Sequence, residues 1–209
     1  MKKVAILIYP EFSIQEVANL MYLFRWHYDC KTVMISVDLN IVVSEEGVMI
    51  KPEQTCADFR KEDYHCLILP GCSGGQPDER VISFLRQFRE EHEFVIGAIC
   101  GGPLFLAMAG VLDHKKFTCS LYMDMIERFA CIHEENVVYA PLVVDENLVT
   151  AVGDASRDFA IAVARRLGLE CSDQALSYVD PAWKEEDFKH YLPAEEIAEF
   201  EKAFQGFFK

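Results

Sequence analysis

The sequence lacks the features that mark metal-binding, membrane-spanning and nucleic-acid-binding proteins. Its 209 residues contain no cofactor-binding motif and no CxxC or HxxxH pair, the spacings that let two side chains hold one metal ion. No apolar run approaches the roughly 20 residues that cross a bilayer. Basic residues are few, 20 against 34 acidic ones, so the formal net charge of −14 repels a phosphate backbone. We therefore expect no metal, no cofactor, no membrane and no nucleic-acid partner.

The basic residues and the cysteines that are present follow no pattern of a binding patch or a disulfide framework. The pairs Lys115-Lys116 and Arg165-Arg166 are isolated, so we expect them on solvated faces or at helix ends. The eight cysteines are irregularly spaced, and the apolar run in MKKVAILIYP is too short for a signal peptide. We therefore expect reduced thiols in the cytoplasm, most of them as small apolar core residues.

What the chain does have is an alternation of apolar strands and amphipathic helices. Hydrophobic residues make up 51% of it, and continuous apolar runs such as 4–9 are typical of strands that are buried on both faces. The predicted fold class is α/β, with a mostly parallel sheet and helices on both of its faces. The expected strands are 4–9, 32–37, 40–43, 48–50, 66–69, 94–99, 116–119, 142–144 and 148–151. The expected helices are one capped by Ser13 and those at 78–91, 103–109, 123–129 and 156–167.

The C-terminal part, 171–209, is rich in Glu, Lys and aromatic residues. We expect it to form one or two helices that pack on the preceding domain, 1–170, or on a partner subunit. A homodimer is therefore predicted. The aromatic residues are Tyr178, Trp183, Phe188, Tyr191, Phe200, Phe204, Phe207 and Phe208.

The segment FVIGAICGGPLFLAMAG (94–110) places Cys100 where an apolar strand gives way to a helix. Ala98, Gly101 and Gly102 surround it with small residues, which is the pattern of a nucleophile elbow, because its tight turn has no room for bulky neighbours. The helix that follows directs its N-terminal amides at the sulfur, which favours the thiolate and predicts a lowered pKa for Cys100. We therefore interpret Cys100 as a reactive thiol rather than a structural core cysteine.

Two further segments reach the carboxyl edge of the sheet, where the sites of open α/β folds lie. The loop LPGCSGG (69–75) can supply amides that form an oxyanion hole together with the amide of Gly101. No lysine follows its glycines, so it is not a phosphate-binding loop. Glu16 follows the first strand, and two roles are open for it. It completes a helix capping box with Ser13, or it lies as a partly desolvated carboxyl against the Cys100 sulfur.

These residues amount to a resemblance. YPEFSIQE, LPGCSGG, AICGGPLFLAMAGVL and VVDENLVTAVGDASRDFAIAVARRLG resemble the ThiJ/PfpI family of the class I glutamine-amidotransferase-like superfamily, over roughly residues 3–170. The resemblance implies a flavodoxin-like sandwich, commonly dimeric, in which a reactive elbow cysteine lies beside a glutamate of the first helix. These two residues correspond here to Cys100 and Glu16, and the oxyanion amides correspond to Gly71, Cys72 and Gly101.

The chain departs from this family at the histidine that its peptidases and amidotransferases place beside the thiol. That histidine stands either directly after the cysteine, where this chain has Gly101, or further downstream, where Ser120 is the counterpart. None of the six histidines occupies either place, and His114 is expected at the far end of the sheet. The missing Cys–His pair argues against proteolysis and glutamine hydrolysis.

Three functions therefore remain open. A Cys100–Glu16 pair can add a thiolate to an activated carbonyl, and the family resemblance implies a glyoxalase- or deglycase-like hydrolase or lyase for small electrophiles such as α-oxoaldehydes. The second possibility is a redox-sensing, stress-response protein in which Cys100 is oxidised and Glu16 holds the sulfinate. In that case Cys72 is either a disulfide partner or a residue that fills a turn. The third possibility is a catalytically inactive binding scaffold.

Overall fold

The computed structural model describes residues 3–72, 74, 78–176, 182, 184, 186, 189, 191 and 193–203. The chain divides into two compact units, 1–176 and 177–209. The second unit contains helix α6 (Ile197–Ala203), and the rest of the helices that we predict for the tail fall largely outside the described residues. None of the helices in the described ranges has the length and apolar character that would let it cross a membrane.

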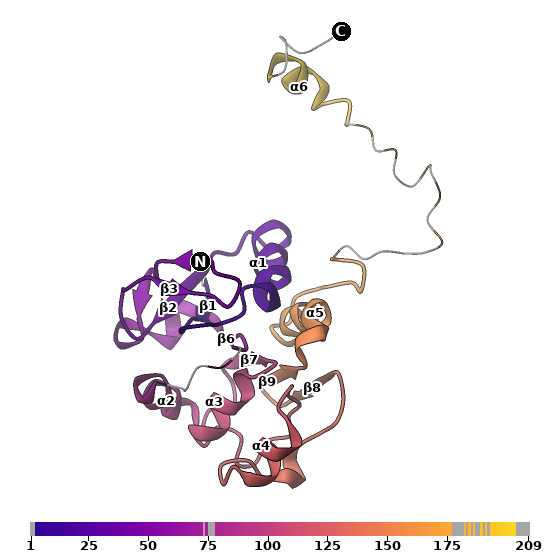
Figure 1. The fold of residues 1–209 in the computed structure, drawn as a ribbon. Coiled ribbons are helices and arrows are strands. Elements are labelled where there is room, and N and C mark those ends of the chain that lie inside the picture. Colours follow the sequence, from indigo (N-terminus) through magenta and orange to yellow (C-terminus); the bar gives the residue numbers. More distant parts are fainter. Residues whose placement is uncertain are drawn as a thin grey trace. The chain divides into compact units, whose positions relative to one another are not determined.

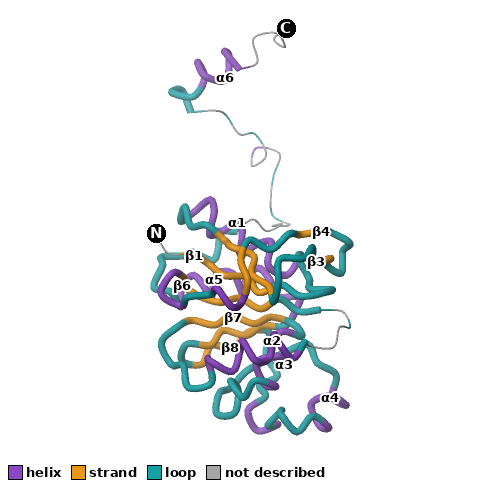
Figure 2. Tube along the Cα trace, turned by 90° about the vertical axis from the view of Figure 1, so that its left-hand side faces the viewer, coloured by secondary structure: helices purple, strands orange, loops and turns teal. Residues whose placement is uncertain are grey.

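A seven-stranded sheet forms the centre of the first unit (Figures 1 and 2). Its strand order is β5-β2-β1-β6-β7-β9-β8, and all neighbours are parallel except β8 and β9. The fold class predicted from the alternation of strands and helices is therefore confirmed. The strands are β1 (Lys3–Leu7), β2 (Thr32–Ser36), β5 (Gln54–Thr55), β6 (Tyr64–Leu69), β7 (Val95–Ile99), β8 (Leu142–Asp145) and β9 (Leu148–Ala151). A separate antiparallel hairpin pairs β3 (Val42–Val43) with β4 (Met49–Ile50), which lie within the expected strands 40–43 and 48–50.

Helices cover both faces of the sheet. Helices α1 (Gln15–His27) and α5 (Ser156–Arg166) pack together on one face, and α2 (Glu79–Leu85) and α3 (Gly102–Met108) pack together on the other (Figure 1). A further short helix, α4 (Met123–Arg128), follows α3. Because both faces are covered, the central strands are buried throughout, and Val4 to Leu7 have no exposed surface at all.

The order of the strands determines where a site can form. From β1 the chain continues to β2 on one side, whereas β6 lies on the other side of β1. Such a reversal opens a crevice beyond the carboxyl ends of the strands. Residues that follow β1, β6 and β7 therefore meet there, and these include Glu16, Gly71 and Cys100.

Three local expectations are wrong. The predicted helix 78–91 is shorter, because α2 ends at Leu85 and continues only as a 3₁₀ turn. The predicted strand 116–119 is a single bridge between Phe117 and Val137. Lys115 is buried rather than solvated, because its ammonium donates to the Glu91 carbonyl at 2.9 Å and to the side chain of Asn147. Asn147 directly precedes β9, so this loop lies at the far end of the sheet, as predicted for His114.

Candidate functional site

Cys100 occupies a strained turn between β7 and α3. Its φ is +58°, a left-handed conformation that non-glycine residues adopt rarely and that is typical of a nucleophile elbow. The turn is held from both sides, since the Cys100 amide donates to the Ala151 carbonyl and its own carbonyl accepts from the Ser120 amide, each at 2.9 Å. Tertiary hydrogen bonds therefore fix the backbone that presents the sulfur.

Of the two glycines after Cys100, the second is the one that the elbow requires. A Cβ at Gly102 would lie 2.7 Å from the Leu69 carbonyl oxygen, so only glycine lets α3 approach the end of β6. Gly101 has an ordinary φ of −86°, and a Cβ there would meet nothing closer than 3.7 Å. The prediction that the turn needs small neighbours holds for Gly102 and not for Gly101.

Glu16 lies against Cys100 and does not complete a capping box. Ile14 is the N-cap of α1 and provides no side-chain cap, and the Ser13 hydroxyl donates to Glu46 instead. The Glu16 side chain is 5% exposed, accepts the Gly71 amide at 2.6 Å and is hydrogen-bonded to the Cys100 thiol. Of the two roles that the sequence leaves open, the structure therefore has the carboxyl that faces the sulfur.

Gly71 completes this contact because it carries no side chain. A Cβ at Gly71 would lie 2.7 Å from Cys100 Cβ, 2.8 Å from Glu16 Oε2 and 3.0 Å from the sulfur. Its amide, assigned to an oxyanion hole by the family resemblance, is used by the Glu16 carboxylate, and its carbonyl accepts from the Ser13 amide at 2.9 Å. Gly71 thus joins the end of β6 to the start of α1.

The pKa of Cys100 is raised, whereas the helix N-terminus predicted a lowered value. Burial raises it first and the Glu16 carboxylate second, to about 12, although the Ser120 hydroxyl and the Gly101 amide act in the opposite direction. Burial also raises the pKa of Glu16. The Glu16 carboxylate thus disfavours ionisation of the thiol, whereas the hydrogen bond from the thiol acts to lower the pKa of Glu16. Between their two titrations the pair holds one proton in its hydrogen bond. The local field of the helix is outweighed first by burial of the thiol and second by the carboxylate that folding brings from α1.

Ser120 lies where the family pattern placed its counterpart. Its hydroxyl is hydrogen-bonded to the Cys100 sulfur, and its oxygen accepts the Gly153 amide at 3.0 Å. A donor to sulfur stabilises the thiolate over the thiol. Ser120 therefore gives the site a hydroxyl donor at the position where the family pattern places a histidine base.

Replacing Ser120 by alanine is expected to raise the pKa of Cys100 further and to slow alkylation of this thiol by iodoacetamide at pH 9 by about two- to tenfold. The modified cysteine is located by mass spectrometry. The matched control is Ser83→Ala, an exposed serine on α2, which should leave the rate unchanged. Equal alkylation rates in the two variants would show that Ser120 does not stabilise the Cys100 thiolate.

Two residues of the site were not predicted from the sequence. Gly153, in the turn between β9 and α5, comes so close that a Cβ would lie 3.0 Å from Glu16 Oε1 and 3.4 Å from the sulfur. Tyr9, in the segment that follows β1, is buried and donates its hydroxyl to the Pro70 carbonyl. Its ring packs against that of Phe105, with ring centroids 4.6 Å apart. The signal that could have found both is their place after strands whose carboxyl ends reach the same edge.

Cys72 lies beside the elbow. The Cβ position of Gly101 is 3.7 Å from the Cys72 amide nitrogen, and a bridge pairs Cys72 with Phe12. No disulfide links any of the eight cysteines. The strongest influences on the Cys100 thiol are burial, Glu16, Ser120 and the Gly101 amide, and none of these is a histidine. Within the described part of the chain, no group of three or more His, Cys, Asp or Glu side chains is arranged to hold a metal ion.

The fold and the site together define a flavodoxin-like α/β protein with an elbow cysteine that is hydrogen-bonded to a glutamate of the first helix. The chain belongs to the DJ-1/PfpI family, whose model matches residues 2–166. This confirms the family resemblance of the sequence motifs.

Relatives of known sequence agree with this assignment, and solved structures agree with the fold. The "Uncharacterized protease YoaZ" of Bacillus subtilis is 30% identical over 174 residues, which cover 80% of this chain and 80% of that protein. "Protein dj-1beta" of Drosophila melanogaster is 27% identical over 132 residues, 60% of this chain and 68% of its own. A DJ-1 superfamily protein of Agrobacterium tumefaciens superposes with a TM-score of 0.72 at 22% identity, over 99% of both chains. The crystal structure of Drosophila DJ-1beta gives 0.65 at 26% identity, over 80% of this chain and 91% of its own.

Proposed function

We propose that the protein is a cysteine-dependent enzyme for small carbonyl electrophiles, with α-oxoaldehydes as the substrate class. Cys100 is the nucleophile and Glu16 carries the proton. The observation that supports this most is the hydrogen bond between the buried Glu16 carboxyl and a thiol on a strained elbow. A thiol whose pKa is about 12 needs a base at the moment of attack, and Glu16 is the base within reach.

The reaction begins with the Glu16 carboxylate accepting the thiol proton while sulfur bonds to the aldehyde carbon. The proton passes to the carbonyl oxygen, which gives a hemithioacetal. Glu16 then takes the proton from C1 of this adduct and returns it to C2, while the hydroxyl proton on C1 passes to the C2 oxygen. C1 is thereby oxidised to a thioester carbonyl, and the neighbouring ketone carbon is reduced to an alcohol. Water cleaves the thioester to a 2-hydroxy acid and restores the thiol. One α-oxoaldehyde and one water are consumed, with no external oxidant or reductant.

Backbone amides stabilise the oxyanion that forms during the first and last steps. The amides of Cys72 and Gly101 are the two that we assign to it, since Gly71 donates to Glu16. This arrangement has no imidazole to protonate a leaving amine, which is why we assign neither a protease nor a glutamine amidotransferase.

The test is turnover of methylglyoxal and glyoxal, measured as 2-hydroxy acid formed. Cys100→Ser is expected to abolish turnover, and the neighbouring substitution Cys72→Ser should retain most of it. Peptide and glutamine substrates are included and should not be hydrolysed. The proposal is overturned if the purified protein turns over none of a panel of aldehydes, amides and esters, or if Cys100→Ser remains active.

A second candidate is a redox role for the same thiol. Glu16 and Ser120 both hydrogen-bond the sulfur, and a protonated Glu16 and the Ser120 hydroxyl are donors for the oxygens of a sulfinate. Mild peroxide followed by mass spectrometry decides this. Oxidation of Cys100 before the other seven cysteines supports the redox role, and earlier oxidation of any other cysteine excludes it.

A further inference from the structure

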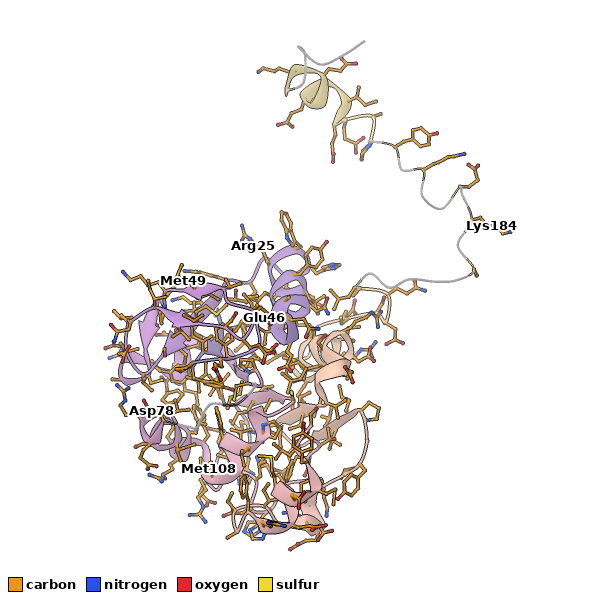
Figure 3. All side chains as sticks on the ribbon, viewed as in Figure 1. Arg25, Glu46, Met49, Asp78, Met108 and Lys184 are labelled. Atoms are coloured by element: carbon orange, nitrogen blue, oxygen red, sulfur yellow. The ribbon has the colours of Figure 1, made fainter. Side chains whose placement is uncertain are left out.

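The segment between β1 and α1 is held by the β3–β4 hairpin. The Glu11 amide donates to the Val43 carbonyl at 2.9 Å, and the Glu45 amide donates to the Phe12 carbonyl at 3.0 Å. The hairpin turn therefore lies along the chain that leads into α1. Figure 3 shows Glu46, which belongs to this turn, beside that helix.

The Glu46 carboxylate caps the first turn of α1. It accepts the Gln15 amide at 2.9 Å, the Ile14 amide at 3.2 Å and the Ser13 hydroxyl at 3.1 Å. Because α1 has no side-chain cap of its own, this remote carboxylate satisfies amides that a helix normally satisfies locally. Burial acts to raise the pKa of Glu46, but hydrogen bonds led by the Gln15 amide lower it to about 2, so the cap stays ionised across the working pH range.

The Glu16 carboxyl could serve either a capping box at the start of α1 or the contact with Cys100, but not both. Ser13 and Glu16 have the spacing of a capping box, in which Glu16 would turn back toward the Ser13 amide. In the structure the Ser13 hydroxyl is bound by Glu46, and the Ser13 amide donates to the Gly71 carbonyl at 2.9 Å. The Ser13 amide, which Glu16 would bind in a capping box, is thereby occupied, and the Ser13 hydroxyl is held as a donor to Glu46. The Glu16 carboxyl is left to reach Gly71 and Cys100.

We infer that Glu46 is a positioning residue, which caps α1 from the hairpin turn and so keeps Glu16 out of a capping box and against Cys100. Glu46 acts through Glu16 and touches none of the reacting atoms. As a statement about catalysis this inference rests on the proposed function. As a statement about the contact between Glu16 and Cys100 it is independent of any reaction.

Glu45 provides a matched control. Both Glu45 and Glu46 add negative charge that raises the pKa of Glu16, but only the Glu46 side chain binds the start of α1. Charge alone would therefore give the same result for Glu45→Gln and Glu46→Gln, whereas capping makes the two differ. Glu46→Gln keeps one acceptor oxygen and Glu46→Ala keeps none.

The experiment measures two quantities in the full-length chain: turnover of methylglyoxal and the pH dependence of Cys100 alkylation by iodoacetamide, followed on the Cys100 peptide. The ionisable groups that face this thiol are Glu16 on α1 and Tyr9 after β1, and Cys72 after β6 in turn faces Tyr9. In Glu46→Ala, Glu16 is withdrawn and the thiol loses a negative neighbour, so the alkaline midpoint of alkylation moves below the wild-type value of about 12.

Glu46→Ala is also expected to lower the turnover number by about tenfold or more with little change in KM, because a misplaced proton carrier affects the chemical step. Glu46→Gln should fall between Glu46→Ala and the wild type, and Glu45→Gln should match the wild type in turnover. The inference is overturned if Glu46→Ala matches Glu45→Gln in both measurements, or if Glu46→Gln alone behaves like Glu45→Gln while Glu46→Ala is unfolded by circular dichroism. If the wild type turns over no carbonyl compound, the proposed function fails and the alkylation midpoints still decide the role of Glu46.

Discussion

Glu16→Gln is expected to lower carbonyl turnover by about 10²–10⁴-fold, the range typical for loss of a general acid–base group. The same substitution makes the thiol easier to ionise. The Glu16 carboxylate raises the pKa of Cys100, so its removal moves the alkaline midpoint of alkylation below about 12, while burial still holds it above that of an ordinary cysteine. If Glu16→Gln has more thiolate and less turnover, then turnover depends on Glu16 as a proton carrier and not only on ionisation of the thiol.

Glu16→Gln is also expected to change the pH dependence of turnover. In the wild type, activity rises as Glu16 loses its proton, at a pH above its ordinary value of 4.5 because burial raises the pKa of this carboxyl. The glutamine variant has no such acid limb. Glu45→Gln is the control, because it removes a nearby charge and leaves the proton carrier in place. An acid limb that survives in Glu16→Gln would assign the base to another residue.

Glu16→Gln is expected to raise the thermal stability of the protein at alkaline pH, although it lowers turnover. A carboxyl whose pKa is raised in the folded state contributes stability that is present below its unfolded pKa and is lost as the pH rises through the folded pKa. Glu16 therefore destabilises the wild type near pH 8 and not near pH 4. Glutamine stays neutral and can accept the Gly71 amide, so the melting temperature of Glu16→Gln should exceed that of the wild type at pH 8, with the difference vanishing toward pH 4.

The local features of this chain could be predicted from its sequence, and the long-range ones could not. Apolar runs placed the strands, and small residues around Cys100 placed the elbow, because both follow from neighbours in the chain. The capping pattern at Ser13 and Glu16 suggested a local cap, but the amides there are satisfied by Glu46 from the hairpin. No periodicity in a sequence reports such a contact.

The direction of the Cys100 pKa was wrong for the same reason. Helix amides are local to the elbow and could be predicted, whereas burial and the Glu16 carboxylate depend on how β1, β6 and β7 are ordered in the sheet. The same holds for Gly153, whose role becomes visible only when β9 is known to lie next to β7. The family resemblance supplied the pairing of Glu16 with Cys100, and it did not supply the electrostatics of that pair.

Gly71→Ala is expected to remove the site while leaving the fold. Its Cβ would lie within 3.0 Å of three atoms of the pair, and no real Cβ tolerates such contacts without movement. The carboxyl cannot move aside without breaking its 2.6 Å hydrogen bond to the Gly71 amide. We expect turnover to fall by about 10²-fold or more, because a displacement of this size separates the reacting groups. The free energy of unfolding should fall by about 1–3 kcal/mol, as for other overpacked buried positions.

Three other glycines provide graded controls for this prediction. A Cβ at Gly153 would meet Glu16 Oε1 at 3.0 Å, so Gly153→Ala should cost activity but less than Gly71→Ala. A Cβ at Gly74, in the same loop as Gly71, meets only the Glu11 carboxylate at 3.7 Å, and one at Gly101 meets nothing closer than 3.7 Å. Both of these alanine variants should keep wild-type turnover. The loss of turnover should be largest for Gly71→Ala, smaller for Gly153→Ala and absent for the other two. A different order would mean that contact with Glu16 and Cys100 is not the reason why these positions require glycine. Tolerance at Gly101 would also show that the residue directly after the nucleophile is sterically open, so that its lack of a catalytic side chain is a matter of chemistry and not of space.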